Sequence, residues 1–412
     1  MMLLSFLKKT WFPLLIAIIP SGLFLAPLPH SSIVYYTSLI FLGGLFAFRS
    51  EKVNIIPIIF LLICAFSILF GKISPFFKPW ARLGLFSLLL MAYFPVFQSK
   101  FSEKIRVKTF LIMLIIIIFT SIGSFIGYFL GINYMEVGLP TYSEGGQSIN
   151  TAGWFGGLTY QSMLLGPICA LSLTVLVWII LEKTHSKKEK LLLICAAFSC
   201  LCCMMLTASR VATIAGIVGA LIVLFMKFRR HITKMVRIGT ILFVLAWTLY
   251  PIYMPYADKV LSKQQKNVES GSMFASRETY WIHRLEEFAE CPIFGYGFCG
   301  VDTKNYGEYS STGTIEPGSS WLAILSMTGI LGAGYFLCLF GTTISKLYRI
   351  FCFQHKSWAL LHIGIIAVFA IHFIAEGYIF SAGGPLCFLF WFFFGCAYSY
   401  AKNPLIEYKL MS

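Results

Sequence analysis

The chain has 412 residues, of which 58% are hydrophobic and 12% are charged, and its formal net charge is +15. Its mean hydropathy is +0.80. In soluble globular domains the charged share is about a quarter, so this composition excludes a water-soluble globule. We therefore expect an integral membrane protein.

Apolar runs long enough to cross a hydrocarbon core of about 30 Å recur along the whole chain. The runs are continuously apolar, which favours helices over barrel strands, whose residues would alternate. About twelve membrane helices are expected, in a single membrane domain that covers residues 1–412. The first run follows Lys8 and Lys9 without a small-residue cleavage site, so it is interpreted as an uncleaved span. The expected spans are 11–28, 33–48, 55–71, 80–97, 109–131, 158–181, 191–207, 211–226, 237–254, 320–345, 358–377 and 380–400.

The basic residues predict how the chain is oriented in the membrane. On these spans, most of the 32 Lys and Arg residues fall on the same side as the two termini. Cytoplasmic loops are enriched in Lys and Arg, so both termini are expected in the cytoplasm. Topology and contact with the lipid bilayer then explain the positive charge, and no nucleic-acid partner is expected.

The longest connection is a large outer loop, residues 255–319, between the ninth and tenth spans. A loop of this length without a function would be unusual. Within it, "SRETYWIHRLEEFAECP" predicts a helix over about 276–290, which Ser276 can cap and Pro292 ends.

One stripe of this predicted helix is apolar and another is basic. Trp281, Leu285 and Phe288 recur at helical spacing. Arg277 and Arg284 are seven residues apart and therefore project from nearly the same face. Such a surface suits the lipid headgroups and can bind an anion.

Arg210 stands between two apolar spans in "MMLTASRVATIAG", Met204–Gly216, on the predicted outer side. The structural alternative is an arginine that snorkels to the interface and ends two helices. However, basic residues are scarce on the outer side, and the turn is too short for a mere loop charge. An ionisable group in this position is a candidate functional residue.

Four sequence blocks in this order and spacing resemble the O-antigen ligase/O-antigen polymerase superfamily of bacterial polytopic membrane glycosyltransferases. The resemblance covers roughly residues 190–340, whereas the N-terminal half matches only as hydrophobic spans. The blocks are "LTASR" before an apolar helix, Arg277 with Trp281 four residues on, "PIFGYGF" at Pro292–Phe298 and "SSWLAILSMTGILG" at Ser319–Gly332.

The resemblance implies an all-α, GT-C-like fold in a bacterial plasma (inner) membrane. It also implies an inverting, metal-independent transfer of a glycan from a polyprenyl diphosphate, such as undecaprenyl diphosphate, at the outer face. In such families two motif arginines bind the diphosphate, which here would be Arg210 and Arg277; Arg284 is added on its own geometry. Guanidinium groups can neutralise a departing diphosphate bidentately, without a metal.

No cofactor is expected. Asp258 and Asp302 are the only aspartates, so the chain has no Asp-x-Asp pair to hold a divalent ion. It also lacks the G-x-x-x-x-G-K-[ST] loop of a built-in ATPase.

The general base is less directly indicated. Ligases of this superfamily usually carry His-Asn shortly before the segment that aligns with Trp321 and Leu322, where this chain has "TIEPGSSW". Glu316 is the candidate base, with an ordinary loop carboxylate as the alternative. His283 is a second candidate base, and Ser319 a candidate acceptor contact. The missing His favours polymerisation over ligation onto a lipid A core.

The leading hypothesis is a polymerase that joins repeat units of O-antigen, exopolysaccharide or capsule. A chain-length regulator or a flippase is then a candidate partner. One alternative is an O-antigen ligase that moves finished glycan to a lipid or protein acceptor. Another is a transporter of polysaccharide or lipid-linked oligosaccharide, which would have charged or broken helices at matching positions of two halves; here the charges gather in outer loops of the second half.

Two further groups leave alternatives open. Lys72, Lys78 and Arg82 form an outer basic cluster against the orientation rule. Either the third and fourth spans are drawn wrongly, or the cluster touches a second diphosphate. His372 and Glu376 lie four residues apart in the eleventh span, where we expect a hydrogen-bonded structural pair, with a proton relay as the alternative.

Overall fold

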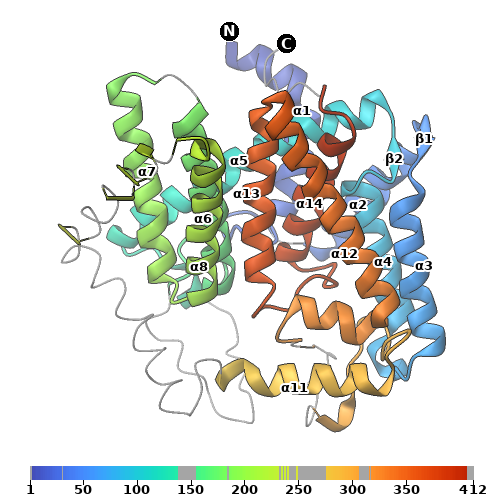
Figure 1. Cartoon of the computed structure of the whole chain (residues 1–412). Helices are drawn as coiled ribbons and strands as arrows, with labels where there is room; N and C mark the ends of the chain where they lie inside the picture. Colours follow the sequence, from blue (N-terminus) through green and yellow to red (C-terminus); the bar gives the residue numbers. More distant parts are fainter. Residues whose placement is uncertain are drawn as a thin grey trace.

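The computed structural model is a bundle of helices with one helix lying across one end (Figure 1). It describes residues 2–29, 31–137, 155–182, 185–231, 275–305, 315 and 317–405, together with 233–234, 236–237, 239–240 and 247–248. Most of the predicted ninth span, 237–254, and much of the predicted loop 255–319 therefore lie outside the described residues, as does Glu316.

Helices make up nearly all of the described secondary structure. The two-residue strands β1 (Lys52–Val53) and β2 (Phe97–Gln98) pair antiparallel. The helices are α1 (Met2–Ser21), α2 (Ser32–Phe48), α3 (Ile55–Phe70), α4 (Pro79–Tyr93), α5 (Lys100–Phe129), α6 (Ser162–Glu182), α7 (Lys187–Leu206), α8 (Arg210–Phe228), α11 (Ala275–Glu290), α12 (Ser320–Gln354), α13 (Ser357–His372) and α14 (Pro385–Lys402), with the 3-10 turns η1 (Pro75–Phe77), η2 (Tyr134–Val137) and η4 (Thr303–Asn305).

The all-α membrane class is confirmed. In the part of the chain that the structure describes, α5, α6, α7, α8 and α12 are long and apolar enough to cross a membrane. Shorter apolar helices cover Trp11–Ser21, Ser32–Phe48, Ile55–Phe70 and Ser357–His372. The structure thus supports a multi-pass protein, while the number of twelve spans stays a prediction.

Helix α14 lies at the centre of the bundle. It is buried on nearly all sides, as expected for a helix that is apolar all round. Around the Trp391 ring, ring centroids of Phe86, Phe94, Phe60 and Phe336 lie 5.4 to 6.1 Å away. This aromatic core ties α3, α4 and α12 to α14 and fixes the helix ends from which the loops emerge.

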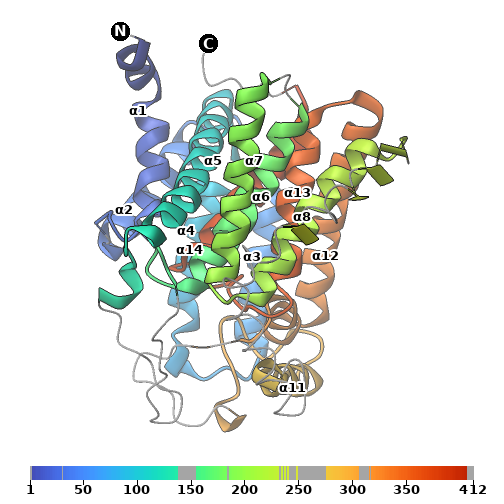
Figure 2. The same cartoon turned by 90° about the vertical axis from the view of Figure 1, so that its left-hand side faces the viewer.

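The loops sort to two ends of the bundle. Helix α1 begins and α14 ends at one end, whereas α11 lies across the opposite end (Figures 1 and 2). Helices α6, α7 and α8 pack together and contact the remaining helices through α13 and α5. On the predicted orientation, the end that carries α11 is the outer end.

The helix predicted over 276–290 is confirmed as α11, Ala275–Glu290, which stops just before Pro292. It starts one residue earlier than expected, so Ser276 lies in its first turn and is not the preceding cap. The expected apolar stripe is only partly buried: Leu285 is 49% exposed, and Arg284 and Glu287 occupy the buried face instead.

Helix α12 is broken where the prediction had one continuous span. Gly329 has φ 65° and ψ −169°, a conformation outside the helical region. The loop after α11 crosses at this break, where Ile330 N–H donates to the Pro292 carbonyl at 2.8 Å and Tyr296 N–H to the Ser326 carbonyl at 2.7 Å. The "PIFGYGF" and "SMTGILG" blocks therefore interlock through their backbones.

Replacing Gly329 by alanine should destabilise the fold. A Cβ there would lie 2.2 Å from the Ile293 carbonyl oxygen, and the positive φ adds strain. We expect Gly329→Ala to lower the thermal midpoint of the purified protein in detergent. Gly334→Ala, on the same helix with no atom within 4 Å of the new Cβ, is the control. Equal midpoints for the two variants would contradict this account of the break.

Candidate active site

Arg210 is the first residue of α8 and follows a tight turn from α7. Ala208 in this turn has φ 53°, and Ser209, which precedes α8, makes no side-chain capping bond to it. The Thr207 hydroxyl donates to the Met204 carbonyl at 2.7 Å and closes α7. A cation at a helix N-terminus meets the positive end of the helix dipole, so this position suits a site that binds an anion.

Arg277 lies in the first turn of α11 and forms an ion pair with Glu376. Its Nη2 lies 2.9 Å from Glu376 Oε1, and the side chains are 18% and 17% exposed. Glu376 belongs to the turn between α13 and α14, so the pair joins α11 to the end of the bundle that it lies across.

Arg210 and Arg277 lie close enough for their charges to repel each other. Arg210 belongs to α8 and Arg277 to α11, and the two residues are 67 positions apart in the sequence. The two arginines therefore lie within electrostatic range of each other at the end that carries α11.

The predicted pairing of His372 with Glu376 is wrong. Helix α13 ends at His372, so Glu376 is not one helical turn further along the same helix. Instead, His372 Nδ1 lies 3.0 Å from the Tyr378 hydroxyl. Glu376 was missed as a site residue because the apolar run around it was interpreted as a span that continues to residue 377.

Arg284 does not share an exposed surface with Arg277. It is fully buried and forms a short ion pair with Glu287, three residues on. The Arg284 Nη1 also reaches the Ser326 hydroxyl at 3.4 Å, and Glu287 Oε1 accepts from the Asp302 N–H at 2.8 Å. This location does not support the prediction that Arg284 binds the diphosphate; Arg284 instead joins α11 to α12.

Burial makes this ion pair costly. It raises the pKa of Glu287 to about 7, although Arg284 and the Asp302 N–H act in the opposite direction. The pair is stable in place because Arg284 and Glu287 compensate each other's charge inside the protein.

The Ser319 hydroxyl is also engaged in hydrogen bonds within the protein. The residue is 2% exposed, its hydroxyl accepts from the Leu322 N–H at 3.4 Å, and it donates to the Phe373 carbonyl at 2.9 Å. Ser319 therefore caps α12, and its position does not support the predicted contact with an acceptor. Of the candidate bases, Glu316 lies outside the described residues, and His283 lies on α11 six residues after Arg277, about 120° around the helix.

The segment around Gly318 packs directly against α11. Trp281 Nε1 donates to the Gly318 carbonyl at 3.3 Å, and a Cβ on Gly318, whose φ is 71°, would lie 2.5 Å from Tyr280 Cβ. A Cβ on Gly377 would similarly lie 2.6 Å from Pro317 Cβ. These contacts hold the segment before α12 between α11 and the turn that carries Glu376.

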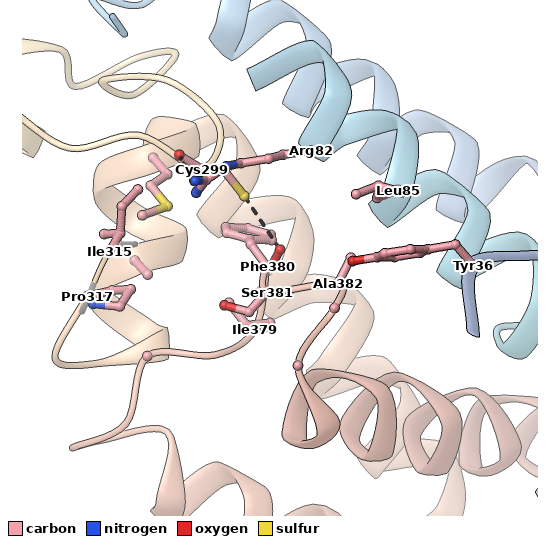
Figure 3. A pocket seen from close by; sticks show the side chains of 15 residues that line it. Tyr36, Arg82, Leu85, Cys299, Ile315, Pro317, Ile379, Phe380, Ser381 and Ala382 are labelled. Atoms are coloured by element: carbon pink, nitrogen blue, oxygen red, sulfur yellow. Dashed lines mark hydrogen bonds between the residues drawn. The ribbon is translucent and has the colours of Figure 1, made fainter. Parts of the chain in front are cut away.

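A cavity of about 460 Å³ opens beside this segment. In Figure 3, Ile315 and Pro317 lie on one side and Tyr36 on the other, and Arg82 reaches toward Cys299. Arg82 Nη1 lies 3.5 Å from the Cys299 carbonyl. The lining thus combines a guanidinium, a phenol and the exposed Ser381 with apolar side chains, a mixture suited to a sugar.

The outer basic cluster is divided between two roles. Helices α3 and α4 cover much the same residues as the third and fourth predicted spans. Lys72 pairs with Glu290 of α11 at 3.1 Å, which raises the pKa of Lys72, while Arg82 lines the cavity. The cluster is therefore on the same end as α11.

Comparison with known protein families agrees with this geometry. Residues 195–337 match the family model described as O-Antigen ligase. The match confirms the resemblance to the O-antigen ligase/polymerase superfamily and supports a glycosyltransferase-like membrane enzyme. It includes both Arg210 and Arg277 and ends within α12. No curated protein matches the chain.

Removing one member of the buried pair should destabilise the protein strongly. Arg284→Gln leaves the Glu287 carboxylate buried without its cation, which should lower the free energy of unfolding by about 3–5 kcal/mol. Without Arg284, the pKa of Glu287 should rise further, and a raised carboxyl pKa costs stability as pH rises toward it. The loss of unfolding free energy in Arg284→Gln relative to wild type should therefore grow as the pH rises above 7, as measured by unfolding in detergent. The double variant Arg284→Met with Glu287→Leu should lose less, and a single variant as stable as wild type would contradict the pairing.

Proposed function

We propose that the protein is an inverting membrane glycosyltransferase that polymerises polysaccharide repeat units from a polyprenyl-diphosphate-linked donor. The observation that carries the proposal is the approach of Arg210 and Arg277 at an uncapped helix N-terminus on the end predicted to face outward. Two neighbouring guanidinium cations repel each other, and an anion bound between them stabilises both. A diphosphate has the charge and the oxygen geometry to accept both guanidinium groups.

In the proposed step, a sugar hydroxyl of the acceptor attacks the anomeric carbon of the donor. The new glycosidic bond forms as the bond to the diphosphate oxygen breaks, and the diphosphate leaves with that electron pair. Arg210 and Arg277 stabilise the charge that develops on it. The hydroxyl proton passes to a base, for which we retain Glu316 as first candidate and His283 as second.

Glu376 acts as a positioning residue in this scheme. The Glu376 carboxylate lies 2.9 Å from the Arg277 guanidinium and thereby orients the N–H groups that bind the diphosphate. The cavity beside Pro317 is the proposed place for the acceptor sugar, because its walls include the neighbours of both Glu316 and Glu376.

A second candidate function is ligation of a finished glycan to a lipid or protein acceptor. The description of the matching family model favours it. The two functions differ in what a deletion strain accumulates. Single repeat units attached to the acceptor indicate a polymerase, whereas polymer retained on its lipid carrier indicates a ligase.

Replacing either site arginine should reduce transfer without preventing insertion. Arg210→Lys and Arg277→Ala should each cut the rate of glycosyl transfer at least ~10-fold, since a charge-assisted hydrogen bond contributes about 1.5–3 kcal/mol. Transfer would be measured with purified protein and lipid-linked donor. Lys72→Gln removes an exposed cation at the same end and is the matched control. Wild-type rates in both arginine variants would end the proposal.

A further inference from the structure

A second cationic cavity lies at the opposite end of the bundle, far from α11. It measures about 350 Å³ and lies where β1, β2, the start of α5 and the end of α14 meet. Its charged lining residues are four basic and two acidic: Lys52, Lys100, Arg106, Lys402, Glu51 and Glu103. None of them takes part in the transfer proposed above.

Arg106 is the buried cation of this cavity. It is 5% exposed, and its Nη2 donates to the Phe97 carbonyl at 2.8 Å. Its guanidinium carbon lies 5.2 Å from the centre of the Phe46 ring, and its buried Nε has no hydrogen-bond partner. Among the described residues, Arg106 forms no ion pair with a carboxylate. A buried guanidinium in this state is expected to meet an anion from outside the chain.

The two acidic residues offset only part of the positive charge, although Glu103 interacts electrostatically with Arg106. Glu103 accepts a hydrogen bond from Asn403 Nδ2 at 3.3 Å, and Glu51 is exposed on the rim. Within the residues that the structure describes, Lys402 Nζ donates to a neutral partner, Asn54 Oδ1, at 3.3 Å, and lies 4.7 Å over the Tyr398 ring. The lining therefore keeps a net positive charge.

Lys402 also lines a neighbouring groove of about 290 Å³ between α3, α12 and α14. The walls of this groove include the apolar groups of Ile56, Leu339 and Ala401. Close in sequence to Lys52 of the cationic cavity, Phe48 and Val53 are large apolar residues that are 90% and 58% exposed. Lys402 thus lines both the cationic cavity and the apolar groove, so the headgroup and an acyl chain of one lipid could occupy the two together.

We propose that this cavity binds the phosphate of an anionic phospholipid, with an acyl chain in the adjoining groove. Basic pockets between membrane helices on the cytoplasmic side are suited to such headgroups. This inference is independent of the glycosyltransferase proposal, because it concerns the other end of the bundle and a different ligand.

The test is lipid binding by the full-length protein in neutral detergent, with phosphatidylglycerol and phosphatidylcholine as probes. Retained lipid is counted by native mass spectrometry, and thermal unfolding reports stabilisation. The wild type should bind phosphatidylglycerol at least ~10-fold more tightly than phosphatidylcholine, and Arg106→Gln and Lys402→Gln should each remove most of this preference. Lys402 is exposed, so Lys402→Gln keeps the test valid if the buried variant fails to fold.

Lys104→Gln is the matched control, since Lys104 is exposed on the same helix and does not line the cavity. It should leave the preference unchanged. Equal binding of the two lipids, or an equal loss in Lys104→Gln, would overturn the proposal. Stabilisation by inorganic phosphate as strong as that by phosphatidylglycerol would also overturn it, because the site would then take a free anion.

Discussion

The proximity of two guanidinium groups is the constraint on which the outer end of this protein depends. Arg210 and Arg277 lie within range of mutual electrostatic repulsion, and Glu376 forms an ion pair with Arg277. Bringing like charges together at the edge of a low-dielectric membrane costs free energy. The cost is offset when an anion completes the site, which is the role we assign to the diphosphate of the donor.

The rest of the outer end serves to hold this arrangement. The interlocked backbones at Gly329 attach the loop after α11 to α12. The hydrogen bonds of Arg284 to Ser326 and of Glu287 to the Asp302 N–H attach the buried face of α11. The Trp281 bond to Gly318 fixes the other flank. These three attachments fix the position of α11, which lies across the end of the bundle, and with it the position of Arg277.

Several of these features could be predicted from the sequence. Helix α11 was located to within a residue because helical spacing and Pro292 act locally. The two motif arginines were identified through the order of four blocks, and their proximity follows from the fold. The break in α12 was not predicted, since Gly329 stands in an uninterrupted apolar run and its conformation depends on a loop more than thirty residues earlier. Arg284 was assigned to the surface because its burial against Ser326 of α12 depends on tertiary packing, although its partner Glu287 lies only three residues on. Glu376 was missed because it was placed inside the predicted eleventh span, and its partner Arg277 lies 99 residues away.

A structure of the protein with undecaprenyl diphosphate bound tests the central claim most directly. The account predicts that oxygens of the diphosphate contact both the Arg210 and the Arg277 guanidinium, at the N-terminus of α8. A diphosphate bound elsewhere, with Arg210 and Arg277 contacting only protein groups, would contradict it.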